Sequence, residues 1–306
     1  MDRAHISKLD ISLDNQKQHY LAGDKVSGLL QLTILGPEGA PYPRIGLVCV
    51  AESKWVESAG TYFHREGQEY KDQRTYVDLA YKMPAYSDKF TGPGEHVIPF
   101  EFTLPDEGIP ASFESPYGSI RYYITANIDQ AHKITYKFTV DSPMQTNFKV
   151  SVGGSVEKVL AFPSIGGGII RLHTSLVKKG FAPGDTIALH CTVENHSTVD
   201  ATPRVTLYET QVYMCGERHK SLQGAVAGPV LGHTVGQQTC DTQTVFVAIP
   251  ATASLSIRSW IVSVKYMIHV TLDIPYTHDM HVNLPVVVVN KEALVEQDKP
   301  IFNSSK

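Results

Sequence analysis

Residues 19–32 have the sequence HYLAGDKVSGLLQL, and residues 180–193 have the sequence GFAPGDTIALHCTV. Each phrase has an aromatic residue, two further residues, then Gly-Asp, and then apolar residues at alternate positions. Gly tolerates positive φ and Asp bonds to nearby backbone, so Gly-Asp predicts a turn. The alternation predicts a strand with one buried face. The same turn and strand are therefore expected twice, 161 residues apart.

Three further phrases repeat in the same order, at an offset that shrinks along the chain. They are PRIGLVCV (43–50) with PRVTLYET (203–210) at 160, PFEFTLP (99–105) with TVFVAIP (244–250) at 145, and SIRYYITANI (119–128) with SVKYMIHVTL (263–272) at 144. Such self-similarity indicates two copies of one structural unit. The shrinking offset implies about fifteen additional residues in the first copy, most simply within residues 57–92.

The overall composition is that of a folded, two-domain protein. A length of 306 residues exceeds that of one ordinary domain. Contents of 42% hydrophobic and 19% charged residues exclude a disordered chain. The net charge of −4 gives no general attraction to nucleic acid or to anionic lipid.

The sequence also predicts a cytoplasmic location. The chain contains no apolar stretch of the ~18–20 residues that a membrane helix needs. Its first residues, MDRAHISKLDISLD (1–14), lack the apolar core of a signal peptide. The four cysteines form no CxxC pair, so neither a disulfide framework nor a zinc site is predicted.

Each copy is expected to be a β-sandwich. The runs are rich in Val, Ile, Thr and Tyr and are interrupted by Pro and Gly, and no convincing long amphipathic helix occurs. We therefore predict an all-β fold of two tandem immunoglobulin-like antiparallel β-sandwiches. The predicted boundaries are sandwiches at 1–148 and 169–292, a glycine-containing linker at 149–168, and a polar tail at 293–306.

The repeated phrases resemble those of the arrestin fold, and most closely those of the α-arrestins, the arrestin-domain-containing proteins. Four segments follow the patterns of that family: Tyr20 to Gly28 (with Ala22 in place of proline), FEFTLPDEGIPASFESPYGSIRYYITANID at 100–129 (with Ile109 in place of leucine), Gly180 to Ile187, and Val264 to Pro275. The similarity covers about 285 of the 306 residues. It implies an N-terminal and a C-terminal arrestin-like sandwich.

The chain departs from this family pattern in three places. Many α-arrestins carry PPxY motifs that dock the WW domains of HECT-type ubiquitin ligases, and this sequence contains none. One branch binds thioredoxin through a cysteine, and this chain has Ser259 at that position. Receptor-binding arrestins have a buried salt-bridge core between the domains, which implies Asp24, Asp273 and Asp279 as candidate inter-domain polar contacts. The short loop DIPYTHDMH (273–281) does not support a phosphate-triggered switch.

Five cations are candidates for anion or cargo contact. Arg121 and Lys265 occupy equivalent outward positions on the repeated strand, and Lys8, Lys17 and Lys25 lie near the first strands. Two interpretations stay open. The cations are solvated charges on strand faces, or they contact acidic or phosphorylated tails through charge-assisted bonds that weaken with salt.

No catalytic, cofactor-binding or metal-binding constellation is predicted. The sequence contains no GxSxG, P-loop or GxGxxG motif. The residues Asp24 and Asp185 fall in different copies, so turn residues are a better interpretation than a catalytic carboxylate pair. The spacing of His278, Asp279 and His281 fits no common zinc site and favours a surface loop.

The resemblance implies a non-enzymatic cytosolic adaptor. Its partners would be cytoplasmic regions of transmembrane proteins, and HECT-type ubiquitin ligases would be recruited indirectly or not at all. The adaptor would be recruited to the plasma membrane or endosomes and would act in endocytosis, endosomal sorting and ubiquitin-linked transport. One alternative is an endosomal sorting component similar to a retromer subunit. Another is an enzyme, or a sandwich that binds a sugar or a metabolite.

Overall fold

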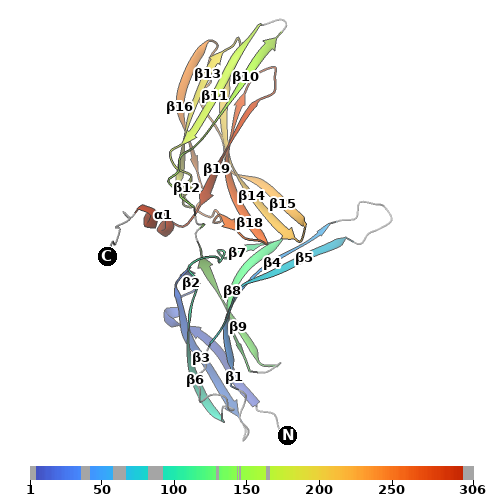
Figure 1. Cartoon of the computed structure of the whole chain (residues 1–306), viewed down its shortest axis with the longest axis vertical. Helices are drawn as coiled ribbons and strands as arrows, with labels where there is room; N and C mark the ends of the chain where they lie inside the picture. Colours follow the sequence, from blue (N-terminus) through green and yellow to red (C-terminus); the bar gives the residue numbers. More distant parts are fainter. Residues whose placement is uncertain are drawn as a thin grey trace, which may run out of the picture. The chain divides into compact units, whose positions relative to one another are not determined.

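The computed structural model describes residues 5–35, 42–57, 67–81, 92–128, 131–142, 144, 146–162 and 166–298 (Figure 1). The chain divides into two compact units. The first comprises Met1–Ser142 with the segments Tyr213–Lys220 and Ser259–Val262, and the second comprises the remainder. The strands β1–β9 are called the first sandwich below, and the strands β10–β19 the second sandwich.

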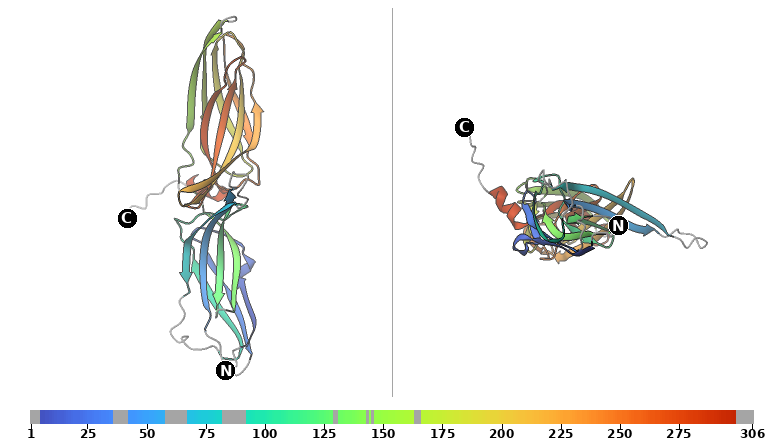
Figure 2. Two further views of the ribbon diagram at one scale, coloured as in Figure 1. Left: turned by 90° about the vertical axis from the view of Figure 1, so that its right-hand side faces the viewer. Right: turned by 90° about the horizontal axis from the view of Figure 1, so that it is seen from below.

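The first sandwich consists of a three-stranded and a six-stranded sheet. Its elements are β1 (His5–Leu13), η1 (Asp14–Gln16), β2 (His19–Leu21), β3 (Lys25–Leu35), β4 (Arg44–Glu57), β5 (Gln68–Ala80), β6 (Gly94–Thr103), β7 (Phe113–Ser115), β8 (Gly118–Asn127) and β9 (Lys133–Asp141). The smaller sheet has the order β1-β3-β6, and the larger has the order β2-β9-β8-β4-β5, with β7 paired to β8. Figure 2 shows these strands, coloured blue to green, from two further directions.

The second sandwich repeats this plan with one additional strand. Its elements are β10 (Val152–Phe162), β11 (Gly166–Leu176), β12 (Gly180–Phe181), β13 (Thr186–His196), β14 (Thr202–Cys215), β15 (Arg218–Leu231), β16 (Thr239–Ala248), β17 (Ile257–Arg258), β18 (Val262–Asp273), β19 (Met280–Val288) and α1 (Lys291–Asp298). The larger sheet, β12-β19-β18-β14-β15 with β17 on β18, has the same order as its counterpart. The smaller sheet has the order β10-β11-β13-β16. The predicted all-β fold of two sandwiches is confirmed.

The repeated Gly-Asp phrase forms the same turn in both sandwiches. The Asp24 carboxylate accepts the Leu21 N–H at 3.0 Å, and the Asp185 carboxylate accepts the Ala182 N–H at 2.8 Å. The preceding glycines have φ of 85° at Gly23 and 87° at Gly184, a backbone conformation that suits glycine. The interpretation of both aspartates as turn residues is confirmed.

The alternation predicted for residues 119–128 sets the core of the first sandwich. In β8, Ile120, Tyr122, Ile124 and Ala126 are buried, whereas Arg121 on the other face is partly exposed. Because side chains alternate along a strand, every second residue of β8 contributes to the core. The outward set, which includes Arg121, is left free to form a surface.

In the segment 149–168, predicted as a linker, residues 152–162 form β10 and residues 166–168 begin β11. These strands pair in antiparallel register from Val152–Leu176 to Phe162–Gly166. A Cβ at Gly167 would lie 2.1 Å from the Leu160 carbonyl oxygen, so the absence of a side chain permits close strand approach. Within the segment predicted as a linker, Gly167 therefore serves strand pairing.

The start of the predicted polar tail belongs to the short helix α1. The Asn290 side chain accepts the Ala293 N–H at 3.1 Å, as expected of a residue that caps a helix. Ala293 is buried with Phe148 and Val289. Leu294 packs against the same cluster, so two apolar residues of the helix make contacts there, and the remaining residues of α1 are largely polar. Residues 299–306 of the predicted tail lie outside the described residues, as do 58–66 and 82–91 of the predicted insertion.

Candidate interaction surface

The outward face of the six-stranded sheet in the first sandwich carries a three-charge cluster. From β8, the Arg121 guanidinium donates two hydrogen bonds of 2.8 Å to the Glu114 carboxylate on β7. Lys137 on β9 also forms an ion pair with Glu114. We call Glu114, Arg121 and Lys137 the charge cluster. It carries two positive charges and one negative charge, so it presents a net positive site.

The electrostatics of the charge cluster follow from these bonds. The Arg121 hydrogen bonds, opposed by partial burial and assisted by Lys137, lower the pKa of Glu114 to about 2. The side chains of Arg121, Glu114 and Lys137 are 38%, 46% and 48% exposed. An incoming anion can therefore reach both cations without any rearrangement of the core.

The other predicted cations of the first sandwich have separate partners. Lys8 donates to the Gln31 side chain at 2.7 Å, and Lys25 pairs with Glu101 at 2.9 Å. Lys17 pairs with Asp24 at 2.8 Å and lies 4.5 Å from the centre of the Tyr20 ring. None of these pairs shares a residue with the charge cluster, so the structure does not join the predicted cations into one network among the described residues. Their role in anion contact stays a prediction.

The surroundings of the turn residue Asp24 shift its pKa. Partial burial tends to raise its pKa, but the Leu21 N–H and the Lys17 ammonium favour the ionised form, and the net result is a lowered pKa. Both partners lie within seven residues of Asp24 along the chain. The candidate inter-domain role of Asp24 stays a prediction.

In the second sandwich, Asp273 and Asp279 come together around one arginine. The Arg204 guanidinium donates to both carboxylate oxygens of Asp273, at 2.8–3.2 Å, and lies 4.0 Å from Asp279. The Asp279 side chain also accepts the Ile274 N–H at 3.2 Å. Lys265 is exposed, and among the described residues it has no hydrogen-bond or ion-pair partner.

Sequence reasoning missed three partners at these sites, namely Glu114, Lys137 and Arg204. Glu114 lies seven positions before Arg121 in a tight β7–β8 hairpin, FESPYGSIR, whose turn residues give a usable signal. Lys137 and Arg204 come from other strands, and only the strand order brings them beside their partners. No short-range pattern in the sequence could have identified them.

Metal ligands and reactive thiols can be assessed in the described part of the chain. No group of three or more His, Cys, Asp or Glu side chains there could hold a metal ion. Burial raises the pKa of the Cys49 thiol to about 12 and that of the Cys191 thiol to about 11, so neither is a ready nucleophile. No helix in these described ranges is long and apolar enough to cross a membrane.

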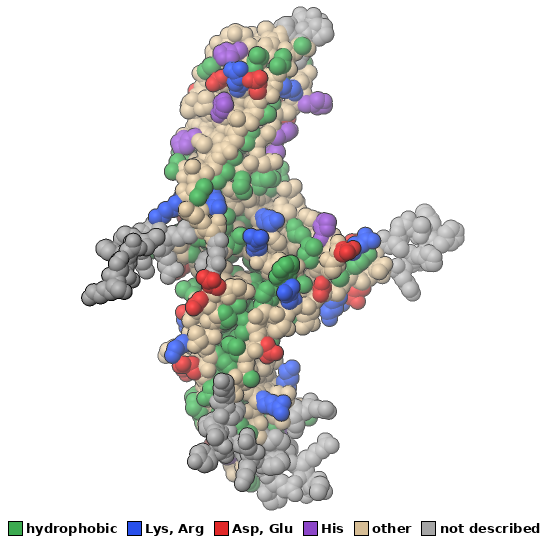
Figure 3. Space-filling model, viewed as in Figure 1, with side chains coloured by type: hydrophobic (Ala, Val, Ile, Leu, Met, Phe, Trp, Pro, Cys, Tyr) green, Lys and Arg blue, Asp and Glu red, His purple; other side chains and the backbone are tan. Residues whose placement is uncertain are grey.

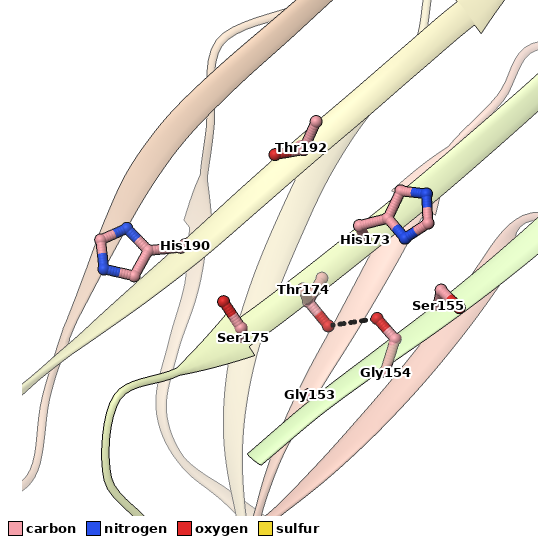
Figure 4. A pocket seen from close by; sticks show the side chains of 8 residues that line it. All are labelled: Gly153, Gly154, Ser155, His173, Thr174, Ser175, His190 and Thr192. Carbon is pink, nitrogen blue, oxygen red and sulfur yellow. Dashed lines mark hydrogen bonds between the residues drawn. The ribbon is translucent and has the colours of Figure 1, made fainter. Parts of the chain in front are cut away.

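One shallow hollow lies on the outward face of the smaller sheet of the second sandwich. It has a volume of about 370 Å³ and is lined by hydroxyls, two imidazoles and two glycines: Gly153, Gly154, Ser155, His173, Thr174, Ser175, His190 and Thr192. His173 and His190 lie at opposite ends of it (Figure 4). Its lining contains no carboxylate, lysine or arginine, which gives it little means to fix a charged ligand.

Comparison with known proteins gives two adjacent matches. Residues 9–150 match the family model described as Arrestin (or S-antigen), N-terminal domain, and residues 167–293 match the Arrestin (or S-antigen), C-terminal domain. The chain is 26% identical to mouse arrestin domain-containing protein 4 over 90% of its own length and 69% of the mouse protein. It is 27% identical to human arrestin domain-containing protein 1, over 65% of this chain and 46% of the human protein. It is 20% identical to rat thioredoxin-interacting protein, over 94% of this chain and 75% of the rat protein.

Proposed function

Because this chain belongs to the arrestin family, we propose that it is a non-enzymatic adaptor that binds the cytoplasmic regions of transmembrane proteins and routes them through endocytosis or endosomal sorting. The similarity to α-arrestins supports an adaptor of the arrestin-domain-containing type. The protein acts in the cytoplasm and joins the plasma membrane or endosomes peripherally. Any link to a HECT-type ubiquitin ligase runs through another protein, because this sequence contains no PPxY motif.

The charge cluster is the observation that carries this proposal. Arg121 and Lys137 share one carboxylate, Glu114, so an acidic or phosphorylated tail can replace Glu114 as their partner. Contacts between a guanidinium and a carboxylate or phosphate are charge-assisted and often bidentate, which favours binding of such tails. The side chains are exposed on a sheet face, which offers room for a macromolecular partner.

The first test is proximity labelling of the tagged chain in cells, read by mass spectrometry. The charge-reversal variant Arg121→Glu with Lys137→Glu is compared with wild type and with Lys54→Glu. Lys54 is a matched control because it forms an exposed ion pair with Glu69 in the same sandwich. We expect wild type and Lys54→Glu to enrich transmembrane proteins and the double variant to lose most of them.

Two outcomes would count against the proposal. Equal enrichment of transmembrane proteins by all three forms would show that the charge cluster does not take part in cargo binding. Enrichment of endosomal coat subunits alone would favour a constitutive sorting component. A binding titration with a multiply phosphorylated peptide sharpens the result, because Glu114→Gln should strengthen binding and Arg121→Gln should weaken it, both more at low salt than at high salt.

A further inference from the structure

Two histidines stack on the outward face of the larger sheet of the second sandwich. The ring centres of His269 on β18 and His281 on β19 are 5.1 Å apart, with 23° between the ring planes. In the β18–β19 register, His269 faces Asn283 and Thr271 faces His281. The two histidines are therefore diagonal neighbours on one face of the sheet. Histidine side chains, purple in Figure 3, are prominent on the surface of the second sandwich.

The hydrogen bonds of these rings leave one nitrogen of each ring available. The Nδ1 atom of His269 is 2.6 Å from the Asn283 side-chain oxygen, which can only accept, so Nδ1 donates. The Nε2 atom of a neutral ring then carries the lone pair. The Nδ1 atom of His281 is 3.3 Å from the hydroxyl of Thr271. Among the described residues, neither Nε2 atom has a hydrogen-bond partner.

We propose that His269 and His281 bind one divalent transition-metal ion of the zinc, copper or nickel class through their Nε2 atoms. Imidazole suits these ions better than it suits magnesium or calcium. Metal-binding histidines commonly bond through the other ring nitrogen to an oxygen that fixes the ring, and Asn283 and Thr271 are placed for this role. Water completes the coordination, since only two protein ligands are present.

Binding requires both rings to rotate. Zinc–nitrogen bonds of about 2.0–2.1 Å at a tetrahedral angle bring the two nitrogens to roughly 3.4 Å. The lone pairs lie in ring planes that are only 23° apart in the structure, so each imidazole rotates about its Cβ–Cγ bond until the two lone pairs converge on the ion. The Tyr208 ring packs edge-on against His269, with ring centres 5.8 Å apart, and limits the alternative orientations of that imidazole.

The nearby carboxylates have cationic partners of their own. Asp273, the last residue of β18, and Asp279, just before β19, share the Arg204 guanidinium, and Lys158 donates to the His278 carbonyl in the same turn. Two carboxylates and two cations balance, so the imidazoles themselves supply the attraction for the ion. The sequence grouped His281 with Asp279 and His278 in a surface loop, whereas the proposed partner is His269 on the adjacent strand.

The second sandwich contains a matched control pair. His173 and His190 are also diagonal neighbours on adjacent strands, because His173 faces Thr192 and Ser175 faces His190. They lie apart across the hollow of Figure 4, and His190 is bonded to the Thr244 hydroxyl at 3.2 Å. This pair has the same residue types and spacing but no stacking, so we do not expect it to bind the metal.

The experiment is a calorimetric titration of the metal-free full chain with zinc chloride alone. We expect one equivalent to bind, with an affinity about tenfold or more weaker in His281→Gln and in His269→Gln, and unchanged in the double control His173→Gln with His190→Gln. Asn283→Ala, which removes only the ring-fixing oxygen, should weaken binding about tenfold. Equal affinity in wild type and His281→Gln, or no binding by wild type, overturns the proposal.

A second measurement does not depend on the folding of any variant. Substoichiometric copper(II) added to the wild-type chain should broaden the NMR ring signals of His269 and His281 before those of the other eleven of its 13 histidines. Broadening that begins at His173 and His190, or that is uniform over all histidines, contradicts the assignment.

Discussion

The two sandwiches share their internal hydrogen bonds but differ in their surface charges. Tyr122 donates through its hydroxyl to the Pro110 carbonyl, and Tyr266 donates to the Ser254 carbonyl, in each case twelve residues upstream. Ser115 closes the turn before β8 with the same side-chain and backbone bonds that Ser259 makes before β18. These bonds satisfy buried backbone groups, which every copy of the fold has to do.

The surface positions diverged because no such requirement acts on them. Arg121 is held by Glu114, whereas its equivalent, Lys265, has no partner among the described residues. Asp24 is paired with Lys17, whereas the bond described for its equivalent, Asp185, is to backbone alone. The repeat therefore encodes the architecture, whereas each copy has its own pattern of surface charge pairs.

The largest expected effect tests whether the two cores are equivalent. Leu47 and Leu207 occupy matching positions in the repeat, and both have 0% exposure. Replacing either with alanine should lower the free energy of unfolding by about 2–5 kcal/mol, because a cavity is left in a packed core. Hydrogen exchange of peptides from each sandwich, read by mass spectrometry, locates the loss in the sandwich that carries the change.

Leu222→Ala serves as the control, because Leu222 on β15 is partly exposed. This substitution should lower the free energy of unfolding by less than about 0.5 kcal/mol. Faster exchange throughout both sandwiches after either core substitution would break the comparison, because it would mean that the two cores unfold as one unit.

A smaller effect is expected at the repeated tyrosine. Tyr122→Phe leaves the Pro110 carbonyl without its partner and should cost about 1–3 kcal/mol. Tyr266→Phe should cost at least as much, because the Tyr266 hydroxyl also contacts Glu209. Chemical denaturation measures both free energies, with Tyr276→Phe, at an exposed residue, as the control. A neutral result for either core variant would show that its hydroxyl bond is dispensable.

The smallest expected effect on stability is that of the Glu114 carboxylate, which belongs to the charge cluster of the first sandwich. The pKa of Glu114 falls from 4.5 to about 2 in the folded chain, so its ionised form stabilises the fold above about pH 4.5. This stabilisation is lost as the pH falls from about 4.5 to about 2. Because the cluster is exposed, Glu114→Gln should lower stability at pH 7 by only about 0.5–1 kcal/mol.

Urea denaturation at pH 7 and at pH 3 measures this difference. The gap between wild type and Glu114→Gln should narrow at the lower pH, whereas Glu107→Gln, at an exposed residue with no ion pair described, should show no such trend. A gap that widens on acidification would contradict the assignment of the charge cluster.

The sequence by itself determined the duplication, the strand alternation and the Gly-Asp turns. These features depend on residues close in sequence, because a turn and a period of two are local properties of the backbone. The inward set of β8 and the turn roles of Asp24 and Asp185 could be predicted for this reason. The assignment of residues 149–168 as a linker missed β10, because its pairing with β11 is decided by close approach at Gly167.

Only the tertiary structure decided which side chains meet across strands. Lys137 reaches Glu114, Arg204 reaches Asp273, and His269 stacks on His281 because sheet order and register bring distant segments within a few ångströms. A single sequence specifies which face a residue occupies, but the neighbour on that face is set by pairing between strands. The architecture could therefore be predicted from the sequence, whereas the candidate binding sites could be identified only in the folded sheets.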